Sequence, residues 1–365
     1  MSKVVKEFLI FSDLHAHNFR YAADRTTIPG RKGLYNSRLA DTVAVLEEIR
    51  KYAVYYKIEE IVFCGDLFHR RSSVPTDVRH VIFDSLKEFS ADNIYLHVLL
   101  GNHDMGDRRG HVHSLAGLDS DFLKVYDNGL DRVSAPGADF IFLPYTDDKE
   151  DAKRSLKLAE EWVLKDQPAI LFAHLGVQGA KVGSDYVLIG PNDISVNDIP
   201  KGKFAASFFG HFHEHQQIFK NGWFVGATHQ HNWGDAYGSR GFLHVKVYEN
   251  GKVDFEQIGT MAPEFVITRD GKTSRGELSM MKENDFVRNI TKDPYQDKDA
   301  LKERWGIKHL ELISENDVVD SEFKLDMSKL SPAQLLEDWV EHKNPNIDRD
   351  KLLAVGREIL KDVGL

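Results

Sequence analysis

The sequence has almost no cysteine and no long hydrophobic run. Cys64 is the single cysteine among 365 residues, which excludes an internal disulfide and fits a reducing cytoplasm. It lies in an apolar run, so we interpret it as a small core residue rather than a nucleophile. No apolar run approaches the roughly 18 residues that a membrane-spanning helix needs. The first residues show no signal-peptide cleavage pattern, so we expect a cytoplasmic protein without a membrane partner.

An excess of positive charge is missing as well. The chain has 47 Lys and Arg residues against 57 Asp and Glu residues, a net charge of −10. Nucleic-acid-binding proteins are usually basic on at least one face, so the total argues against such a substrate. Arginines are nevertheless frequent beside the motifs described next, and the local field decides whether a phosphate binds. They are Arg20, Arg25, Arg31, Arg38, Arg70, Arg71, Arg108 and Arg109.

Polar motifs follow five apolar runs along the chain. Each run has the length and composition of a buried strand, and α/β proteins gather ligands at the carboxyl ends of such strands. Aspartate, asparagine and histidine together suit divalent ions such as manganese, iron or zinc. The sequence therefore predicts a metal centre. The motifs are Asp13-Leu14-His15, Gly65-Asp66-Leu67-Phe68-His69, Gly101-Asn102-His103-Asp104, His174 and Gly210-His211-Phe212-His213.

This composition favours hydrolysis of phosphate esters. Two metal ions about 3.5–4 Å apart can clamp a phosphoryl group and supply hydroxide, so no serine or cysteine nucleophile is needed. Two such ions carry four positive charges, of which Asp13 and Asp66 offset two. The site would thus be locally positive in a chain that is acidic overall.

Three further residues of these motifs are candidates for catalysis. His103 need not bind metal and can donate a proton to the leaving oxygen. His69 can reach the phosphate, and Asp104 can orient a neighbouring group. Each could instead be an ordinary turn or surface residue. The order of the motifs and their shared position after strands favour the functional interpretation.

The pattern Gly-His-x-His occurs twice. His211 and His213 follow an apolar run, and side chains two residues apart in an extended segment point the same way, so this pair can bind metal. His111 and His113 follow no such run, and we expect them in a loop on the substrate side or on the surface. We also expect loop positions, not ligand roles, for His17, His215, His229 and His231.

Alternating patterns of strands and helices predict a layered α/β architecture. Apolar residues at helical spacing predict helices over about 34–57, 75–89 and 151–164, and residues 216–247 resemble short antiparallel strands. A small β-α-β unit follows residue 263, and two helices follow Ser331. We expect a catalytic domain at 1–262, a small capping domain at 263–318, and a linker with a helical hairpin at 319–365.

The motif set resembles the calcineurin-like metallophosphoesterase superfamily over about residues 5–245. Within it, Gly65-Asp66-Leu67-Phe68-His69 is similar to the version in SbcD-type nucleases, the catalytic subunits of complexes that process DNA double-strand breaks. The segments 226–228 and 240–242 also resemble that branch. The resemblance implies a four-layer α/β/β/α sandwich with a small α/β capping unit and a C-terminal helical hairpin.

The resemblance also implies roles for the motif residues. Two divalent ions, expected to be manganese, would be bound; His103 would be the catalytic histidine and His69 a phosphate contact. One ion would be surrounded by Asp13, His15, Asp66 and His213. The other would be surrounded by Asp66, Asn102, His174 and His211.

A nuclease of this branch cleaves duplex ends as an exonuclease and single strands as an endonuclease. It works in DNA repair, recombination or replication, commonly as a homodimer, in a bacterial cell or a phage-infected host. Its hairpin binds an SMC-like coiled-coil ABC ATPase of the SbcC type. One alternative is a stand-alone metallophosphoesterase that acts on small phosphodiesters, nucleotides or phosphoproteins. A non-catalytic scaffold is the other, but no expected ligand is missing.

Overall fold

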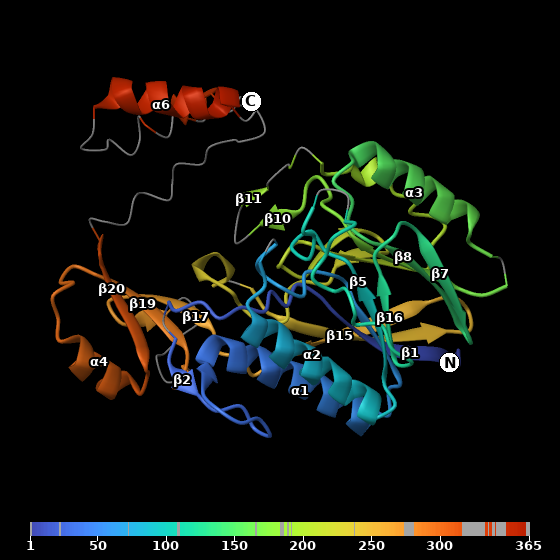
Figure 1. Ribbon diagram of the computed structural model, residues 1–365, viewed down its shortest axis with the longest axis horizontal. Helices are drawn as coiled ribbons and strands as arrows, with labels where there is room; N and C mark the ends of the chain where they lie inside the picture. Colours follow the sequence, from blue (N-terminus) through green and yellow to red (C-terminus); the bar gives the residue numbers. More distant parts are fainter. Residues whose placement is uncertain are drawn as a thin grey trace. The chain divides into compact units, whose positions relative to one another are not determined.

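The computed structural model shows two compact units (Figure 1). The first comprises residues 1–266, 281–286 and 306–309, and the second comprises 267–280, 287–305 and 310–365. The expected three-way division of the chain stays a prediction. The residues that the structure describes are 2–21, 23–71, 73–107, 110–164, 166–182, 186–187, 190, 192–236, 238–273, 281–315, 333–334, 336–337, 340 and 348–362.

The first unit contains two six-stranded sheets. In the first sheet, β1, β4, β5 and β6 are parallel, whereas β15 pairs antiparallel with β1 and with β16. Three of the strands that precede polar motifs, β1, β4 and β5, are neighbours here. Across the sheet the order is β16 (Val253–Gly259), β15 (Gly241–Tyr248), β1 (Val4–Phe11), β4 (Glu60–Phe63), β5 (Tyr95–Leu99) and β6 (Leu123–Tyr126).

The second sheet contains the other two motif-bearing strands, β9 and β12, which are parallel neighbours. The turn at Asn221-Gly222 joins β13 and β14 as an antiparallel hairpin, as the sequence predicts, but β15 belongs to the first sheet. Across the second sheet the order is β13 (Gln216–Phe219), β14 (Gly222–Phe224), β12 (Ala206–Gly210), β9 (Ala169–His174), β8 (Ala138–Leu143) and β7 (Asp131–Ala135).

Three helices of the first unit lie close to their predicted ranges. They are α1 (Ser37–Tyr56), α2 (Thr76–Ala91) and α3 (Lys149–Glu161). The side chain of Asn36 caps α1 by accepting from the backbone of Arg38 and Leu39, and α1 ends where Lys57 takes a left-handed conformation. No helix among the described residues is long and apolar enough to cross a membrane.

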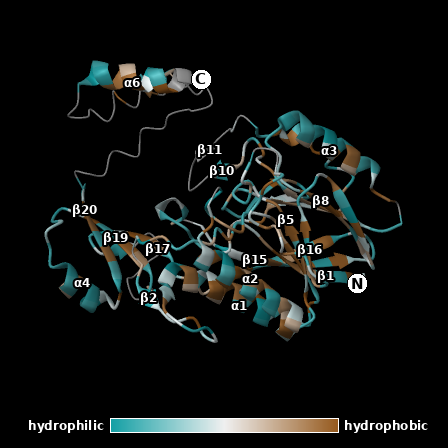
Figure 2. Cartoon of the chain, in the orientation of Figure 1, coloured by the Kyte–Doolittle hydropathy of each residue, from teal (hydrophilic) through white to brown (hydrophobic). Residues whose placement is uncertain are grey.

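Apolar side chains on both faces of the sheets form three cores among the described residues. In β1, Leu9 and Phe11 pack with α1 and α2, whereas Phe8 and Ile10 face the second sheet. The third core packs the second sheet against α3, for example at Leu156. Burial on both faces explains why the strands are apolar throughout, and Figure 2 shows them largely in brown.

Short strand pairs and single-turn helices complete the first unit. They are β2 (Arg25–Thr26), β3 (Tyr35–Asn36), β10 (Lys181–Val182), β11 (Tyr186–Val187) and the 3-10 turns Val196–Asp198 and Trp233–Asp235.

The second unit contains most of a four-stranded sheet and two described helices. The sheet order is β18 (Lys272–Thr273), β17 (Phe265–Arg269), β19 (Phe286–Thr291) and β20 (His309–Ser314). Helix α4 (Lys298–Trp305) lies between β19 and β20 in the chain, as the predicted β-α-β pattern requires.

The C-terminal helix α6 (Arg349–Asp362) begins at the predicted cap, where Asp348 accepts from the backbone of Asp350 and Lys351. Gly356 lies so close to Leu336 that a Cβ there would be 2.6 Å from the leucine side chain, and Arg357 pairs with Glu337. Several residues of the first predicted helix, including Ser331, Leu335 and Trp339, lie outside the described residues.

We expect Phe172→Ala to lower the free energy of unfolding by about 3–5 kcal/mol, because it removes a fully buried ring from the core between the two sheets. Urea unfolding followed by circular dichroism measures the loss. The control is Tyr55→Ala on α1, whose side chain is 78% exposed. It should stay within about 0.5 kcal/mol of wild type. Equal losses in the two variants would contradict this placement of the core.

Candidate metal centre

The ends of β1 and β4 carry the first two motifs side by side. The backbone N–H of Asp13 donates to the backbone carbonyl of Gly65 at 3.0 Å, and that of His15 donates to the backbone carbonyl of Asp66 at 3.0 Å. Asp13, His15 and Asp66 have positive φ angles of 49°, 45° and 63°, and His211 has 104°. Such angles cost about 1–3 kcal/mol per residue and gather at functional sites. The backbone is therefore strained where the predicted ligands lie.

Glycine is required at positions 65 and 101, because neighbouring atoms there leave no room for a side chain. Gly65 has a φ of 97°, and a Cβ there would lie 2.3 Å from Nδ1 of His174. A Cβ on Gly101 would lie 2.2 Å from the backbone nitrogen of Asp66. The glycines that precede Asp66 and Asn102 thus let two motifs and His174 approach one another.

One group of side chains contains Asp13, His15 and His213, whose ligand atoms all lie within 4.8 Å of one another. The two Nε2 atoms of His15 and His213 are 3.1 Å apart. Asp66 lies beside this group, with Oδ2 at 3.5 Å from Nε2 of His15. We call Asp13, His15 and His213 the first ligand group.

A second ligand group contains Asp66, His174 and His211, again within 4.8 Å. Oδ1 of Asp66 is 3.5 Å from Nε2 of His174. Oδ1 of Asn102 is 3.0 Å from Nε2 of His174 and 2.9 Å from Nδ1 of His211. The structure therefore brings all seven predicted ligands into two adjacent groups, with Asp66 next to both.

These residues fit a pair of divalent cations. The Asn102 amide lies within 3.3 Å of ring nitrogens of His174 and His211 and of Oδ2 of Asp66. The other ring nitrogen of His174 donates to the carbonyl of Cys64 at 2.6 Å. Nδ1 of His213 likewise donates to Oδ1 of Asp235 at 3.3 Å. Such bonds fix the tautomer and aim the free Nε2 lone pair inward, as in metal-binding histidines. Two carboxylates, an amide oxygen and four imidazole rings at these distances are a donor set that suits divalent cations.

Burial and neighbouring charges shift the pKa values of the group members. Burial raises the pKa of Asp13, and it lowers that of His15. Burial, aided by His174, lowers the pKa of His211 to about 3. For His174, burial lowers the pKa, but the Asp66 carboxylate outweighs it and raises the value to about 9. At neutral pH His174 therefore holds a proton where a cation would otherwise sit.

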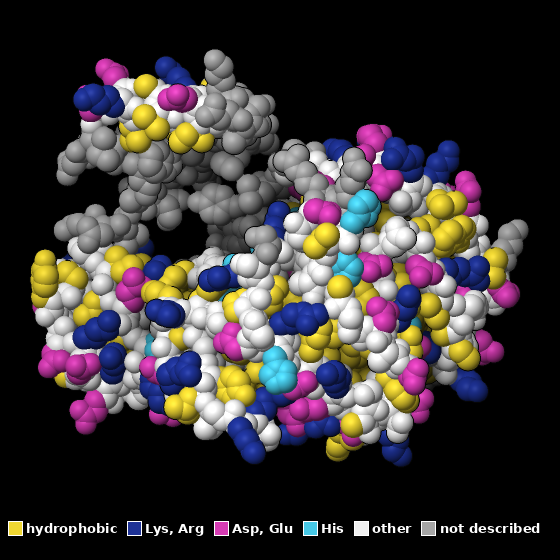
Figure 3. Space-filling model, viewed as in Figure 1, with side chains coloured by type: hydrophobic (Ala, Val, Ile, Leu, Met, Phe, Trp, Pro, Cys, Tyr) yellow, Lys and Arg dark blue, Asp and Glu magenta, His cyan; other side chains and the backbone are white. Residues whose placement is uncertain are grey.

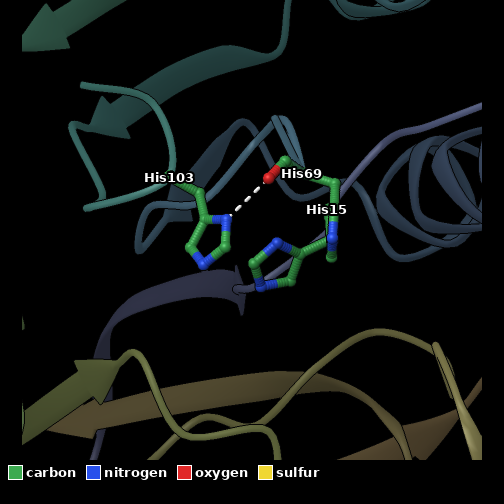
Figure 4. Close-up of side chains that lie close together, drawn as sticks. All are labelled: His15, His69 and His103. Atoms are coloured by element: carbon green, nitrogen blue, oxygen red, sulfur yellow. Dashed lines mark hydrogen bonds between the residues drawn. The ribbon is translucent and has the colours of Figure 1, made fainter. Parts of the chain in front are cut away.

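His69 and His103 lie beside the first ligand group (Figure 4). Together with His15 they have ring nitrogens within 4.8 Å of one another. Nδ1 of His103 donates to the backbone carbonyl of His69 at 2.6 Å, which fixes the ring of His103. Burial, with the neighbouring His103, lowers the pKa of His69 to about 4, so it is neutral at pH 7.

Asp104 lies behind the site and contacts only backbone in it. Its buried carboxylate accepts N–H groups from Asp66, Leu67, Phe68 and Gly101 at 2.9–3.2 Å. It therefore orients the turn that carries Asp66. The part in catalysis expected of Asp104 stays a prediction.

The remaining histidines of the motif regions belong to neither ligand group. His17 stacks on Phe19, and His215 donates to the carbonyl of Phe224. Nε2 of His113 lies 2.9 Å from Asp127, and His111 and His113 line a cavity of about 810 Å³. Acidic residues gather in the wall of that cavity, at Asp127, Asp147, Asp148 and Asp151.

The arginines beside the motifs do not all face the site. Arg31 pairs with Asp84 and Glu88 of α2, and Arg38 is buried. Arg70 and Arg71 are exposed directly after the second motif. On the face that Figure 3 shows, Lys and Arg side chains are mixed with Asp and Glu. Positive charge next to the site thus comes from Arg70, Arg71 and any bound ions.

Sequence reasoning missed the residues that support His213. Asp235 is buried and accepts from His213 and, at 3.2 Å, from Arg240. His231, expected in a loop, is buried there and donates from Nε2 to the carbonyl of Asp13 at 2.9 Å. One local pattern could have drawn attention to Asp235: it is three residues after Asn232, the spacing of a capping box, and the two residues form such a box around a 3-10 turn.

Comparisons with known proteins place these observations in context. Residues 6–215 match the family described as calcineurin-like phosphoesterase. The DNA double-strand break repair protein Mre11 of Methanocaldococcus jannaschii is 25% identical over 326 residues, which cover 84% of this chain and 85% of that protein.

Two solved structures are similar at lower identity. A dimetal phosphatase from Danio rerio has a TM-score of 0.45 and 14% identity, covering 70% of this chain and 97% of that chain. GAP50, described as the anchor in the inner membrane complex of Plasmodium, has a TM-score of 0.35 and 12% identity, covering 70% and 89%.

We expect the affinity for Mn²⁺ to rise with pH between 7 and 9. Because the pKa of His174 is raised to about 9, a bound ion must displace its proton below that pH. One competing proton changes the affinity by about tenfold per pH unit, and the rise should level off above the pKa. Isothermal titration with Mn²⁺ measures this. His174→Ala should lose the part of the rise that continues up to about pH 9. A flat profile for wild type would contradict the role of this proton.

Proposed function

This chain belongs to the calcineurin-like phosphoesterase family, and we propose that it is a DNA nuclease that hydrolyses phosphodiester bonds. The family uses a dinuclear site of divalent metal ions, and the two ligand groups offer such a site. The similarity to Mre11 carries the DNA part of the proposal. It covers 84% of the chain, so it extends well beyond residues 6–215, the part that any phosphoesterase of the family would share.

The residues have distinct tasks in this proposal. Asp13, His15 and His213 would hold one ion, Asn102, His174 and His211 the other, and Asp66 would touch both. When bound, the ions would supply Lewis-acid activation of the phosphodiester and of water. His103, fixed by the carbonyl of His69, would give a proton to the leaving oxygen. Arg70 and Arg71 would attract the phosphate backbone.

The finer features of the proposal go beyond the catalytic site. We take the three cores as the contacts between layers of a four-layer α/β/β/α sandwich. The ions would be manganese, the enzyme a cytoplasmic homodimer, and the substrates duplex ends and single strands of DNA.

The C-terminal hairpin would bind a coiled-coil ABC ATPase of the SMC-like class. Helix α6 supports this role because it leaves Val355 and Ile359 exposed, at 53% and 57%. Apolar side chains at helical spacing on one helix can enter a groove or pair with another helix.

We expect His103→Ala to keep metal binding but lose DNA cleavage, because His103 lies beside the ligand groups without belonging to the two that would hold the ions. Removing a general acid typically costs about 10²–10⁴-fold in rate. Asp66→Ala should lose metal binding as well, since Asp66 is next to both groups. Degradation of linear DNA with Mn²⁺, together with metal analysis of each protein, tests both statements.

Equal DNA degradation by wild type and both variants would contradict the assignment of the site. Hydrolysis of a small phosphodiester such as bis(p-nitrophenyl) phosphate by wild type, with no degradation of DNA, would favour the stand-alone phosphoesterase instead. Lys87→Ala on α2 is a suitable control because its side chain is 74% exposed and its ion pair is with Asp84 of the same helix.

We expect Val355→Asp with Ile359→Asp to stop co-purification with the ATPase, because the change places charge on the exposed apolar residues of α6. Deletion of residues 331–365 should do the same and leave metal content unchanged. Tyr295→Asp, at a residue that is 94% exposed in the second unit, serves as the control. Unchanged pull-down of the ATPase by the double variant would remove the docking role of α6.

A further inference from the structure

Arg38 is a buried cation in the first turn of α1. The residue is 6% exposed. The guanidinium lies over the rings of Phe265 and Phe286, at 5.2 and 4.7 Å from their centres. Nη2 donates to the backbone carbonyl of His231 at 3.0 Å, across 193 residues of sequence. Burying an arginine is costly unless its donors are used, so this contact needs an explanation.

His231 links that carbonyl to the first ligand group. Its Nε2 donates to the backbone carbonyl of Asp13 at 2.9 Å. Its backbone N–H donates to Oδ2 of Asp235 at 2.9 Å, and the other oxygen of Asp235 accepts from His213. Two of the three members of the first ligand group, Asp13 and His213, are thus held through a loop that Arg38 fixes in place.

The second ligand group is held by different contacts. His174 donates to the carbonyl of Cys64, and the Asp104 carboxylate binds the turn that carries Asp66. Neither contact involves residues 228–236 or Arg38. The supports of the two groups are therefore largely different, although the backbone N–H of His211 donates to the Asp13 carboxylate and Asp66 lies next to both groups.

We propose that Arg38 is a positioning residue for one of the two ions, the one that Asp13, His15 and His213 would hold. Through His231 and Asp235 it fixes the direction of the Asp13 backbone and of the His213 ring. Phe265 and Phe286, which stack on each other and on Arg38, are the first residues of β17 and β19. The inference rests on the two-ion site of the proposed function, but not on DNA as the substrate.

Mn²⁺ binding to the full-length protein tests the proposal. Two parent variants are used, His174→Ala and His213→Ala, each of which should keep only one of the two metal-binding groups. In His174→Ala, binding at the first ligand group should remain. Adding Arg38→Met should weaken it by about tenfold, the lower end of the loss for a partner bonded directly to a metal ligand, because Arg38 acts through His231. In His213→Ala, binding at the second group remains, and adding Arg38→Met should leave it within about twofold of the parent. Electron paramagnetic resonance of free Mn²⁺ gives both affinities.

Two controls separate positioning from general damage. Arg38→Lys keeps a charged donor and should recover part of the lost affinity. Arg31→Met removes another largely buried arginine, which pairs with Asp84 and Glu88 away from the site, and should change neither background. Retained Mn²⁺ binding in the protein with both His213→Ala and Arg38→Met shows that the loss of Arg38 leaves the fold intact.

An unchanged affinity in His174→Ala with Arg38→Met, or an equal loss in both backgrounds, would overturn the proposal. The experiment uses Mn²⁺ alone, so its outcome differs from that of the proposed function. A protein that binds two Mn²⁺ ions with this dependence on Arg38 but degrades no DNA would refute the nuclease and leave the inference standing.

Discussion

The structure depends on holding two carboxylates and four histidine rings, all able to bind metal, in two groups whose ligand atoms lie within 4.8 Å of one another. The Asn102 amide lies within 3.0 Å of ring nitrogens of both His174 and His211. A pair of divalent cations would balance the buried carboxylates and use the imidazole lone pairs. Much of the surrounding chain serves to keep the atoms there: strained backbone at Asp13 and Asp66, a glycine beside His174, and carbonyls that fix the rings. The extensive cores on both sides of the two sheets offset that strain.

Two sheets are needed because neither contains enough ligands. The first sheet supplies Asp13, Asp66 and Asn102 from the ends of β1, β4 and β5, and the second supplies His174 and His211 from β9 and β12. The backbone N–H of His211 donates to the carboxylate of Asp13 at 3.1 Å, so the sheets are joined at the site itself. Metal binding would therefore also strengthen the contact between the sheets.

Much of this could be predicted from the sequence, for local reasons. The strands before Asp13, Asp66, Asn102, His174 and His211 are buried on both faces, which leaves unbroken apolar runs, and α1 to α3 show helical spacing. The distribution of the strands over two sheets could not be predicted from periodicity, because pairing such as β1 with β15 joins residues that are distant in sequence. Nor could the roles of Arg38 and Asp235, which depend on such contacts. The likeness to a known family supplied the grouping of the ligands into two sets, but not the parts of Arg38 and Asp235.

The most direct test of the central claim is anomalous diffraction from crystals of the full-length protein grown with Mn²⁺. The account predicts two peaks: one bounded by Asp13, His15 and His213, the other by Asn102, His174 and His211, with Asp66 between them. A single peak, or peaks away from these residues, would contradict the claim that the seven side chains share a pair of cations.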